Sequence, residues 1–383
     1  MKKRIAVFLG GYLPAKKYGG PVTSIANLVD NLGEELGFYI ISNDHDLNES
    51  ARLPGIKEGW NEVGKAKVLY IPEKQYKKAV FRKILKEIKP DVVYLSSVFY
   101  YAMNFPAIAA AREYQIPIVL APRGELCEGA LQKGRLKKAL FVYFERLIGI
   151  FHGVYFHSTS EEETAAIVNI LKIPESMVFQ IPNMPCAVSN NRDKTKIPGI
   201  LRAVFISRIV RKKNLLFAIQ QIKRCEAKIC FDIFGPIEDK TYWDECIQEI
   251  QTSPDNIRIQ YLGELKPEEA KTIYQAYDVF IFPTLSENYG HVIVEAISSL
   301  CPVLLSKGTT PWDDIDGNGG FVIPLEDEMK WASTLEQLAK MDNTEYQELL
   351  GRLYDYSQNK LRIDHLKQEY EKLFQFANGE GQL

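Results

Sequence analysis

The sequence predicts two doubly wound α/β domains in tandem, each built on a parallel sheet. Short apolar runs rich in β-branched residues alternate with segments of helical periodicity along most of the chain. The length of 383 residues exceeds that of one ordinary core. Between 184 and 199 the periodicity is weak, and Asn, Lys, Pro and small residues dominate, which is typical of a linker. We therefore expect one domain over 1–183 and a second over 200–360.

The first half of the sequence contains seven short apolar runs that we expect to be strands. They span Arg4–Leu9, Phe38–Ser42, Lys67–Ile71, Asp91–Leu95, Pro117–Ala121, Val154–His157 and Val178–Ile181. Between the first two runs, apolar residues recur at the spacing of a buried helix face, and Gly19-Gly20-Pro21 precedes them. The two glycines allow the backbone to approach a ligand closely. An ordinary strand-to-helix loop fits the local sequence equally well.

Six further runs predict the strands of the second sheet, with helical stretches between them. They span Ala203–Ile206, Ile229–Phe234, Ile257–Tyr261, Asp278–Phe282, Pro302–Leu305 and Phe321–Ile323. Helical periodicity also covers roughly 344–377. Two similar α/β domains in tandem imply a cleft between them, which is a common location for ligand sites.

The overall composition excludes several classes of protein. A formal net charge of -2 gives no reason to expect nucleic acid as a partner. The six cysteines are scattered, without a CxxC pair or zinc-type spacing, and Asp44-His45-Asp46 lacks a further ligand. We therefore expect no metal and a reduced, cytosolic protein. The run Ile5–Leu9 is too short for a signal peptide, and no apolar run approaches the roughly 18 residues that span a bilayer.

The segment from Ser286 to Ala296 carries the strongest functional signal. It joins the apolar run that ends at Pro283 to a stretch with helical spacing, and it contains Glu287 and Glu295. Open α/β sheets bind ligands at the carboxyl ends of their strands. The free N–H groups of a helix start favour phosphate. We therefore interpret this segment as the binding site of a nucleotide sugar.

Other interpretations of these residues are weaker. A glycosidase needs its two carboxylates about 5–5.5 Å or about 6.5–9.5 Å apart, whereas eight residues of helix rise about 12 Å. A favourable interaction with the helix dipole explains Glu287 but not Glu295, which lies two turns further on. His291 could donate to a phosphate or a sugar, although a lone histidine at a helix start is more often a surface residue.

A basic turn follows the first strand of the second domain. Its four cations are Arg208, Arg211, Lys212 and Lys213. Cations between a strand end and a helix start can clamp a pyrophosphate, arginine as a planar fork and lysine as a mobile point charge. For Arg211 and Lys212 we favour the interpretation that they lie in a solvated basic loop. We assign Arg208 and Lys213 to function because they share a domain with the segment 286–296.

Two basic amphipathic stretches occur in the first domain, at Lys77–Lys86 and Lys133–Phe144. Helices that mix cations with aromatic and aliphatic residues can rest on an anionic membrane surface. Helices that cover a parallel sheet have the same pattern, and we favour this packing interpretation.

Taken together, these features resemble the retaining glycosyltransferase family 4, which has the two-domain GT-B fold. The resemblance covers most of the chain and is strongest in Glu287-x7-Glu295 followed by Pro302-Val303. Weaker matches are Gly19-Gly20, Ile181-Pro182-Asn183, Arg208, Lys213 and Phe234-Gly235-Pro236. Two positions depart from the family pattern. Pro122-Arg123-Gly124-Glu125 stands where many members carry a histidine and is similar to a bacterial surface-polysaccharide subgroup, and Leu300 stands where a glycine is usual.

The resemblance implies a role for each candidate residue. Arg208 and Lys213 would hold the donor pyrophosphate and stabilise the leaving group, and together with Glu287 they form the catalytic set. The implied donor-binding set is Gly19, Gly20, Arg208, Lys213, Gly235, Glu287, Asn288, Tyr289, Gly290, His291 and Glu295. Within this set Glu295 would bind the ribose hydroxyls, and Gly20 would abut a phosphate. Arg123 is the candidate on the acceptor side.

The implied activity is transfer of a sugar, with retained anomeric configuration, from a nucleotide sugar to a glycan or lipid-linked acceptor in cell-surface polysaccharide synthesis. A UDP-sugar is the expected donor, GDP-mannose is the alternative, and no cofactor or metal is obligatory. The protein would be cytoplasmic, with a peripheral contact to the inner membrane face left open. Its C-terminal helix, about 361–383, would return to the first domain. Three alternatives remain: a GT-B epimerase, a phosphorylase, or a nucleotide-sugar-binding subunit without turnover.

Overall fold

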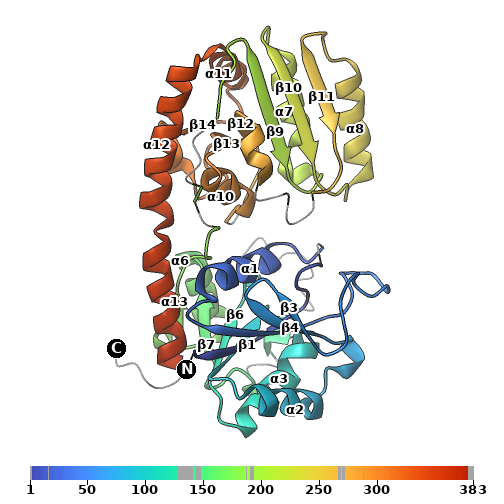
Figure 1. The fold of residues 1–383 in the computed structure, drawn as a ribbon, viewed down its shortest axis with the longest axis vertical. Helices are drawn as coiled ribbons and strands as arrows, with labels where there is room; N and C mark the ends of the chain where they lie inside the picture. Colours follow the sequence, from blue (N-terminus) through green and yellow to red (C-terminus); the bar gives the residue numbers. More distant parts are fainter. Residues whose placement is uncertain are drawn as a thin grey trace. The chain divides into compact units, whose positions relative to one another are not determined.

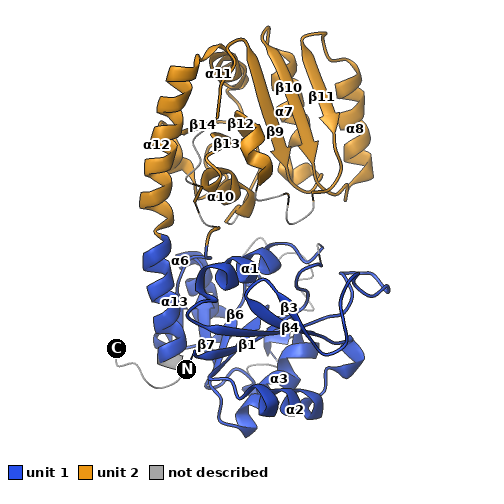
Figure 2. Ribbon diagram, viewed as in Figure 1, with its two compact units in different colours: residues 1–184, 363–383 blue, residues 185–362 orange. Residues whose placement is uncertain are grey.

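The structure is a computed structural model of the chain. It describes residues 2–15, 17–127, 141–143, 148–186, 188–189, 194–265, 269, 272–287 and 289–377. The chain forms two compact units, Met1–Met184 with Ile363–Leu383 and Pro185–Arg362 (Figures 1 and 2). Each unit contains one sheet of mainly parallel strands, which confirms the predicted pair of parallel-sheet α/β domains.

The sheet of the first unit has eight strands in the order β3-β4-β2-β1-β5-β6-β7-β8. Neighbouring strands are parallel except β3 and β4, which are antiparallel. The strands are β1 Arg4–Leu9, β2 Gly37–Ser42, β3 Trp60–Val63, β4 Ala66–Tyr70, β5 Val92–Ser96, β6 Ile118–Ala121, β7 Tyr155–Ser158 and β8 Val178–Gln180. The sequence analysis missed β3, because this short edge strand is only partly buried and has no apolar run.

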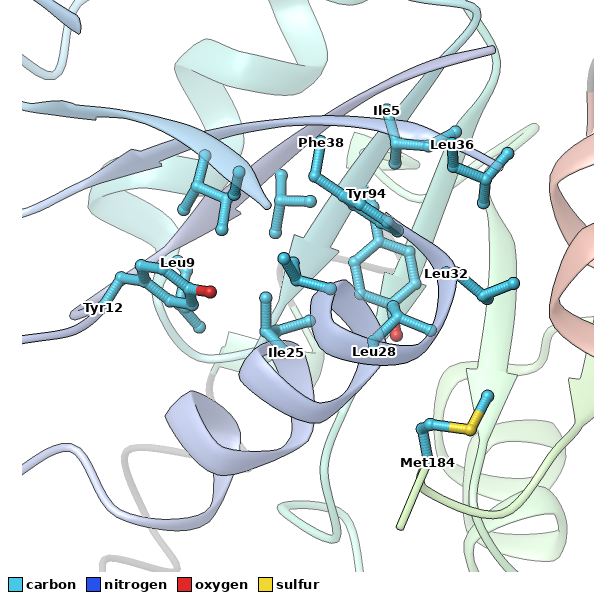
Figure 3. Packing of buried hydrophobic residues seen from close by; sticks show 14 of the residues in the cluster. Ile5, Leu9, Tyr12, Ile25, Leu28, Leu32, Leu36, Phe38, Tyr94 and Met184 are labelled. Carbon is cyan, nitrogen blue, oxygen red and sulfur yellow. The ribbon is translucent and has the colours of Figure 1, made fainter. Parts of the chain in front are cut away.

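Helices cover both faces of this sheet, and a hydrophobic core lies under each face. The helices are α1 Gly20–Leu32, α2 Lys78–Ile88, α3 Tyr101–Glu113, α6 Glu161–Ala166 and α13 Ile363–Ala377, with short 3-10 or π turns at Glu73–Gln75, Ile167–Leu171 and Glu175–Met177. One core joins residues of α1 and α13 to residues such as Ile5 and Val7 of β1. Figure 3 shows part of this core, with Ile25, Leu28 and Leu32 of α1 and Ile5 of β1. The other core joins α2 and α3 to Ala6 and Phe8. The alternation of side chains along β1 therefore supplies both cores.

The sheet of the second unit has six parallel strands in the order β11-β10-β9-β12-β13-β14. All six lie where the sequence predicts strands: β9 Ile200–Ile206, β10 Lys228–Phe234, β11 Ile257–Tyr261, β12 Val279–Phe282, β13 Val303–Ser306 and β14 Gly320–Ile323. The helices are α7 Leu215–Lys223, α8 Lys240–Gln251, α10 His291–Ser298, α11 Glu328–Lys340 and α12 Asn343–Leu361, with 3-10 turns at Arg211–Lys213, Tyr274–Ala276 and Asp313–Ile315.

The structure shows where the predicted linker and one of the two basic stretches lie. Lys194 and Lys196 lie in the stretch expected to be a linker, but both are buried in the second unit. In α2, the residues Phe81, Ile84 and Leu85 of the basic stretch Lys77–Lys86 are buried in the core, as the packing interpretation requires. The other basic stretch, Lys133–Phe144, falls outside the described residues except for 141–143. Within the described ranges, no helix has the length and apolar character needed to cross a bilayer.

Candidate active site

The topology of the second sheet brings two of the predicted site segments together. β9 lies between β10 and β12, and it pairs in parallel with β12 from Ala203 opposite Val279. The chain continues from β9 towards β10 and β11, and from β12 towards β13 and β14 (Figure 1). The loops after β9 and β12 therefore leave the same edge of the sheet at the point where the strand order reverses. This is where open α/β sheets bind ligands.

An ion pair between a buried lysine and a partly buried glutamate joins these two loops. Lys213 ends the 3-10 turn after β9 and is only 7% exposed, and its ammonium is paired with the carboxylate of Glu287 from the loop after β12. The ammonium also lies 5.3 Å from the ring centroid of Phe282. Burial lowers the pKa of Lys213, and the nearby Glu287 opposes this shift. The N–H of Leu285 donates to the carbonyl oxygen of Lys212 at 2.9 Å, which fixes one loop against the other.

Arg208 lies at the same edge of the sheet but has a different partner. Its guanidinium donates to Glu238 at 3.0 Å, and both side chains are about half exposed, at 57% and 45%. The charge of Arg208 also lowers the pKa of Lys213, which shows that the two cations are close enough to repel each other. An exposed ion pair contributes about 0–1 kcal/mol. Arg208 can therefore exchange Glu238 for an anionic ligand at small cost.

Gly235 shapes the turn that carries Arg208. It has φ of 134°, and a Cβ at this position would lie 1.9 Å from the carbonyl oxygen of Ser207. On either side, the N–H of Ser207 donates to the Phe234 oxygen at 3.1 Å, and the N–H of Ile209 donates to the Pro236 oxygen at 2.8 Å. The structure thus gives Gly235 a supporting role in addition to the predicted contact with a ligand.

The loop after β12 turns sharply into α10. Gly290 has φ of 74° and directly precedes the helix. A Cβ at Gly290 would crowd Cδ1 of Ile293 at 2.8 Å and Cγ of Glu287 at 3.2 Å, and together with the positive φ this favours glycine. The rings of Tyr289 and His291 are in edge contact, with centroids 4.9 Å apart. Asn288, which was also predicted to contact the donor, lies outside the described residues.

Glu295 lies in α10 and is half-buried. Burial raises the pKa of its carboxyl group to about 7, and a hydrogen bond with Tyr274 partly opposes this shift. The hydroxyl of Tyr274 also donates to the carbonyl oxygen of Val292 at 3.1 Å. A carboxyl group held at this pKa is strongly perturbed, which is common at functional sites.

The loop after β13 completes the site, and the sequence analysis did not identify it. The N–H of Glu287 donates to the carbonyl oxygen of Thr309 at 2.7 Å, and the indole N–H of Trp312 donates to that of Tyr289 at 2.6 Å. These contacts hold the backbone of Glu287 and Tyr289. The sequence did contain a signal for this loop. The strand β13 follows β12 along the chain, and consecutive parallel strands usually lie side by side, so their loops leave the same edge of the sheet.

The first unit contains the other predicted site residues. Gly19 caps the N-terminus of α1 with φ of 67°, and Gly20 and Pro21 begin the helix. The guanidinium of Arg123 donates to the hydroxyl of Tyr94 at 2.8 Å and to the side-chain oxygen of Asn183. Arg123 therefore has partners within its own unit, and the predicted acceptor-side role of Arg123 stays a prediction.

Comparison with known proteins agrees with this architecture. Residues 201–341 match the family described as glycosyl transferases group 1. The D-inositol 3-phosphate glycosyltransferase of Corynebacterium diphtheriae is 37% identical over 91 residues, which are 24% of this chain and 21% of that protein. This match thus spans about a fifth of the relative's length. The alpha-monoglucosyldiacylglycerol synthase of Acholeplasma laidlawii is 24% identical over 364 residues, covering 85% of this chain and 86% of the synthase.

A solved structure shows the same fold over nearly the whole chain. The Anabaena protein HepE, in complex with UDP and glucose, superposes with a TM-score of 0.70 at 13% identity, covering 98% of this chain and 100% of HepE. The two parallel-sheet domains are therefore those of a GT-B glycosyltransferase fold. The match of residues 201–341 to the glycosyl transferases group 1 family confirms the family resemblance found in the sequence.

Proposed function

We propose that the protein is a retaining glycosyltransferase that moves a sugar from a UDP-sugar to a glycan or lipid-linked acceptor. The observation that carries this proposal is the ion pair between the buried Lys213 and the partly buried Glu287 at the reversal of the strand order. Burying two charges costs desolvation energy. A ligand that offers a diphosphate to Lys213 and sugar hydroxyls to Glu287 satisfies both groups.

The proposed chemistry follows from this exchange of partners. The donor diphosphate becomes the counter-ion of Lys213, and Glu287 accepts hydrogen bonds from sugar hydroxyls. The bond between the anomeric carbon and the diphosphate oxygen breaks, and Lys213 and Arg208 stabilise the charge that grows on the leaving group. The acceptor oxygen bonds to the anomeric carbon on the same face, and its proton leaves with the diphosphate. Configuration is retained in this scheme.

The identity of the donor and acceptor rests on the relatives. HepE was solved with UDP and glucose, which supports a uridine nucleotide. The name of the Acholeplasma relative indicates a glycolipid product, which supports a lipid-linked acceptor. GDP-mannose is the alternative donor. We propose that Gly19 and Gly20 contribute to donor binding, as the family resemblance implies.

A thermal-shift screen against nucleotides and nucleotide sugars tests the donor. We expect UDP or a UDP-sugar to raise the melting temperature most, because a ligand at 100 times its Kd stabilises the folded state by about 2.7 kcal/mol. Transfer is then followed with the selected donor, and the anomeric configuration of the product is determined by NMR. Conversion of the donor without an acceptor would indicate an epimerase instead. The absence of any shift with every nucleoside diphosphate would contradict the proposal.

The variant Glu295→Gln tests the proposed ribose contact, because it should change both the stability of the protein and its affinity for UDP. The folded-state pKa of Glu295, about 7, is above its usual value of 4.5. The stability associated with the neutral carboxyl group is therefore complete below about pH 4.5 and is lost as the pH rises through 7. At pH 8 we expect the variant to melt at a higher temperature than the wild type but to bind UDP about tenfold more weakly. At pH 4.5 the two melting temperatures should converge.

Calorimetric Kd values and melting curves at both pH values measure these effects. Glu238→Gln, at an exposed carboxylate of the same unit, is the control and should change neither melting temperature appreciably. A variant that is more stable at pH 8 yet binds UDP as tightly as the wild type would show that Glu295 does not contact the nucleotide.

A further inference from the structure

The C-terminal end of α10 is built without the glycine that is usual there. Leu300 occupies the left-handed region, with φ of 52°. Its N–H donates to the Ile297 oxygen at 3.0 Å, and the N–H of Cys301 donates to the Ala296 oxygen at 2.9 Å, which is the Schellman arrangement. A leucine in this conformation is strained, because its Cβ approaches the neighbouring carbonyl oxygen. Surrounding contacts must therefore hold this helix end in place.

Lys194 supplies such a contact from the stretch that precedes β9. Its buried ammonium donates to the carbonyl oxygens of Leu300 at 3.0 Å, Tyr274 at 3.0 Å and Tyr277 at 3.2 Å. An ammonium group has three protons, so every donor of Lys194 is used. Its positive charge also suits the C-terminal end of a helix. Lys194 thus ties the end of α10 to the 3-10 turn Tyr274–Ala276.

The same stretch of chain contacts α10 a second time. The N–H of Ser189 donates to the carbonyl oxygen of Ser298 at 2.7 Å. Further along, the carbonyl oxygen of Lys194 accepts from the side-chain amide of Gln347 in α12 at 2.6 Å. Lys194 is therefore itself fixed, and it is a suitable anchor for the helix end.

Tyr274 connects this anchor to Glu295. Tyr274 is fully buried, and its backbone carbonyl is held by Lys194. Its hydroxyl donates to the carbonyl oxygen of Val292 in α10, and its interaction with the carboxyl group of Glu295 lowers the pKa of that group. α10 is thus held at its end by Lys194 and along its side by a tyrosine that Lys194 also holds.

We propose that Lys194 is a positioning residue for nucleotide binding, because it fixes α10 and Tyr274 so that the Glu295 carboxylate faces the ribose hydroxyls. This inference rests on the proposed role of Glu295. Lys194 contacts neither the ligand nor the reacting atoms. Its loss should therefore weaken the recognition of ribose and raise KM for the donor, while kcat at saturating donor changes little.

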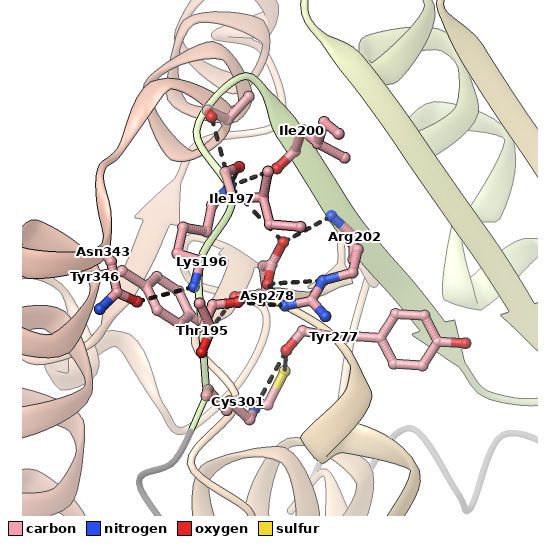
Figure 4. Close-up of polar contacts among 12 residues, drawn as sticks. Thr195, Lys196, Ile197, Ile200, Arg202, Tyr277, Asp278, Cys301, Asn343 and Tyr346 are labelled. Carbon is pink, nitrogen blue, oxygen red and sulfur yellow. Dashed lines mark hydrogen bonds and ion pairs between the residues drawn. The ribbon is translucent and has the colours of Figure 1, made fainter.

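Lys196 offers a matched control two residues further along the chain (Figure 4). Its ammonium is also buried, and it contacts the carbonyl oxygens of Ile197 at 3.0 Å, Ala339 at 3.5 Å and Ile200, with the Asp278 carboxylate at 3.8 Å. None of these groups belongs to α10 or to the turn 274–276. Lys196→Met should therefore cost stability, as Lys194→Met does, without affecting Glu295.

The experiment compares Lys194→Met, Lys196→Met and Glu295→Gln in the full chain. Calorimetry measures Kd for UDP and GDP and for their 2′,3′-dideoxy analogues, and steady-state assays measure KM and kcat for the donor. We expect Lys194→Met to raise Kd for the ribonucleotide about tenfold and to reduce its preference over the dideoxy analogue towards that of Glu295→Gln. Lys196→Met should keep both the affinity and the preference of the wild type within about twofold.

A second variant keeps the test decisive if Lys194→Met does not fold. Tyr274→Phe removes the hydroxyl that reaches Val292 and Glu295 but keeps the backbone carbonyl that Lys194 holds, and it should show the same loss of ribose preference. Suppose that Glu295→Gln loses the preference for the ribonucleotide. Wild-type preference in the folded Lys194→Met protein would then overturn the inference. If Lys194→Met does not fold, wild-type preference in Tyr274→Phe would overturn it. If Glu295→Gln itself keeps the wild-type preference, the proposed role of Glu295 fails, and this inference fails with it.

Discussion

Replacing Lys213 with methionine is expected to lower the turnover of sugar transfer by about 10²–10³-fold. Methionine retains most of the buried volume beside Phe282 but removes the charge that, in the proposed function, faces the departing diphosphate. The loss should appear in kcat as well as in kcat/KM, because the stabilised charge develops only in the transition state. Steady-state kinetics with a saturating nucleotide sugar measures it.

Stability has to be separated from chemistry in this experiment. Lys213→Met leaves the carboxylate of Glu287 without its ion-pair partner, and removing one member of a buried pair can cost about 3–5 kcal/mol. The double variant Lys213→Met with Glu287→Gln removes both charges and should recover much of the lost stability, but not the lost turnover. A double variant that recovers turnover as well would show that the charge of Lys213 has no catalytic role.

Arg211→Met is the control for charge in the same turn. Arg211 is exposed, pairs with Glu245 and lies 5.3 Å from the ring centroid of Tyr242, so it belongs to the solvated part of the loop. We expect its replacement to leave kcat within about twofold of the wild type. If Arg211→Met and Lys213→Met had equal effects, the general positive potential of the loop, rather than one ammonium, would explain the loss.

The parallel sheets could be predicted because their strands are buried on both faces. Continuous apolar runs such as Val279–Phe282 are then visible in the sequence without any knowledge of partners. The candidate site followed from the rule that open α/β sheets bind ligands at the carboxyl ends of their strands. The sequence analysis grouped Lys213 with Glu287 because both follow strands of the second domain, and the structure joins them in an ion pair.

Contacts to backbone carbonyls could not be predicted in the same way. Lys194 and Lys196 lie in a polar stretch that has the composition of a linker, yet their ammonium groups are buried against carbonyl oxygens. Any residue type can supply a carbonyl, so no sequence pattern marks the partner. Leu300 shows the converse: the missing glycine was visible in the sequence, but not the lysine that holds this helix end.

Gly235→Ala is expected to destabilise the second unit by about 3 kcal/mol and to lower kcat/KM by about 10–100-fold. A Cβ at this position would lie 1.9 Å from the carbonyl oxygen of Ser207, and the backbone φ of 134° is rarely adopted by other residues. The turn after β9 has to move away from the added methyl group. Arg208 directly follows Ser207 in this turn and would move with it. Urea unfolding and steady-state kinetics below the unfolding transition measure the two effects separately.

Gly263→Ala distinguishes close approach from backbone conformation alone. Gly263 also has positive φ, 84°, and its carbonyl oxygen accepts the N–H of Gly235 at 2.9 Å, but a Cβ there would meet nothing within 4 Å. Only the conformational cost applies, so we expect a loss of about 1 kcal/mol with unchanged kcat/KM. Equal destabilisation by the two alanines, with full activity in both, would mean that the contact with Ser207 does not set the position of Arg208. A selective loss of activity in Gly235→Ala instead requires that contact, because the two glycines follow the neighbouring strands β10 and β11 and differ in the space around the added methyl group.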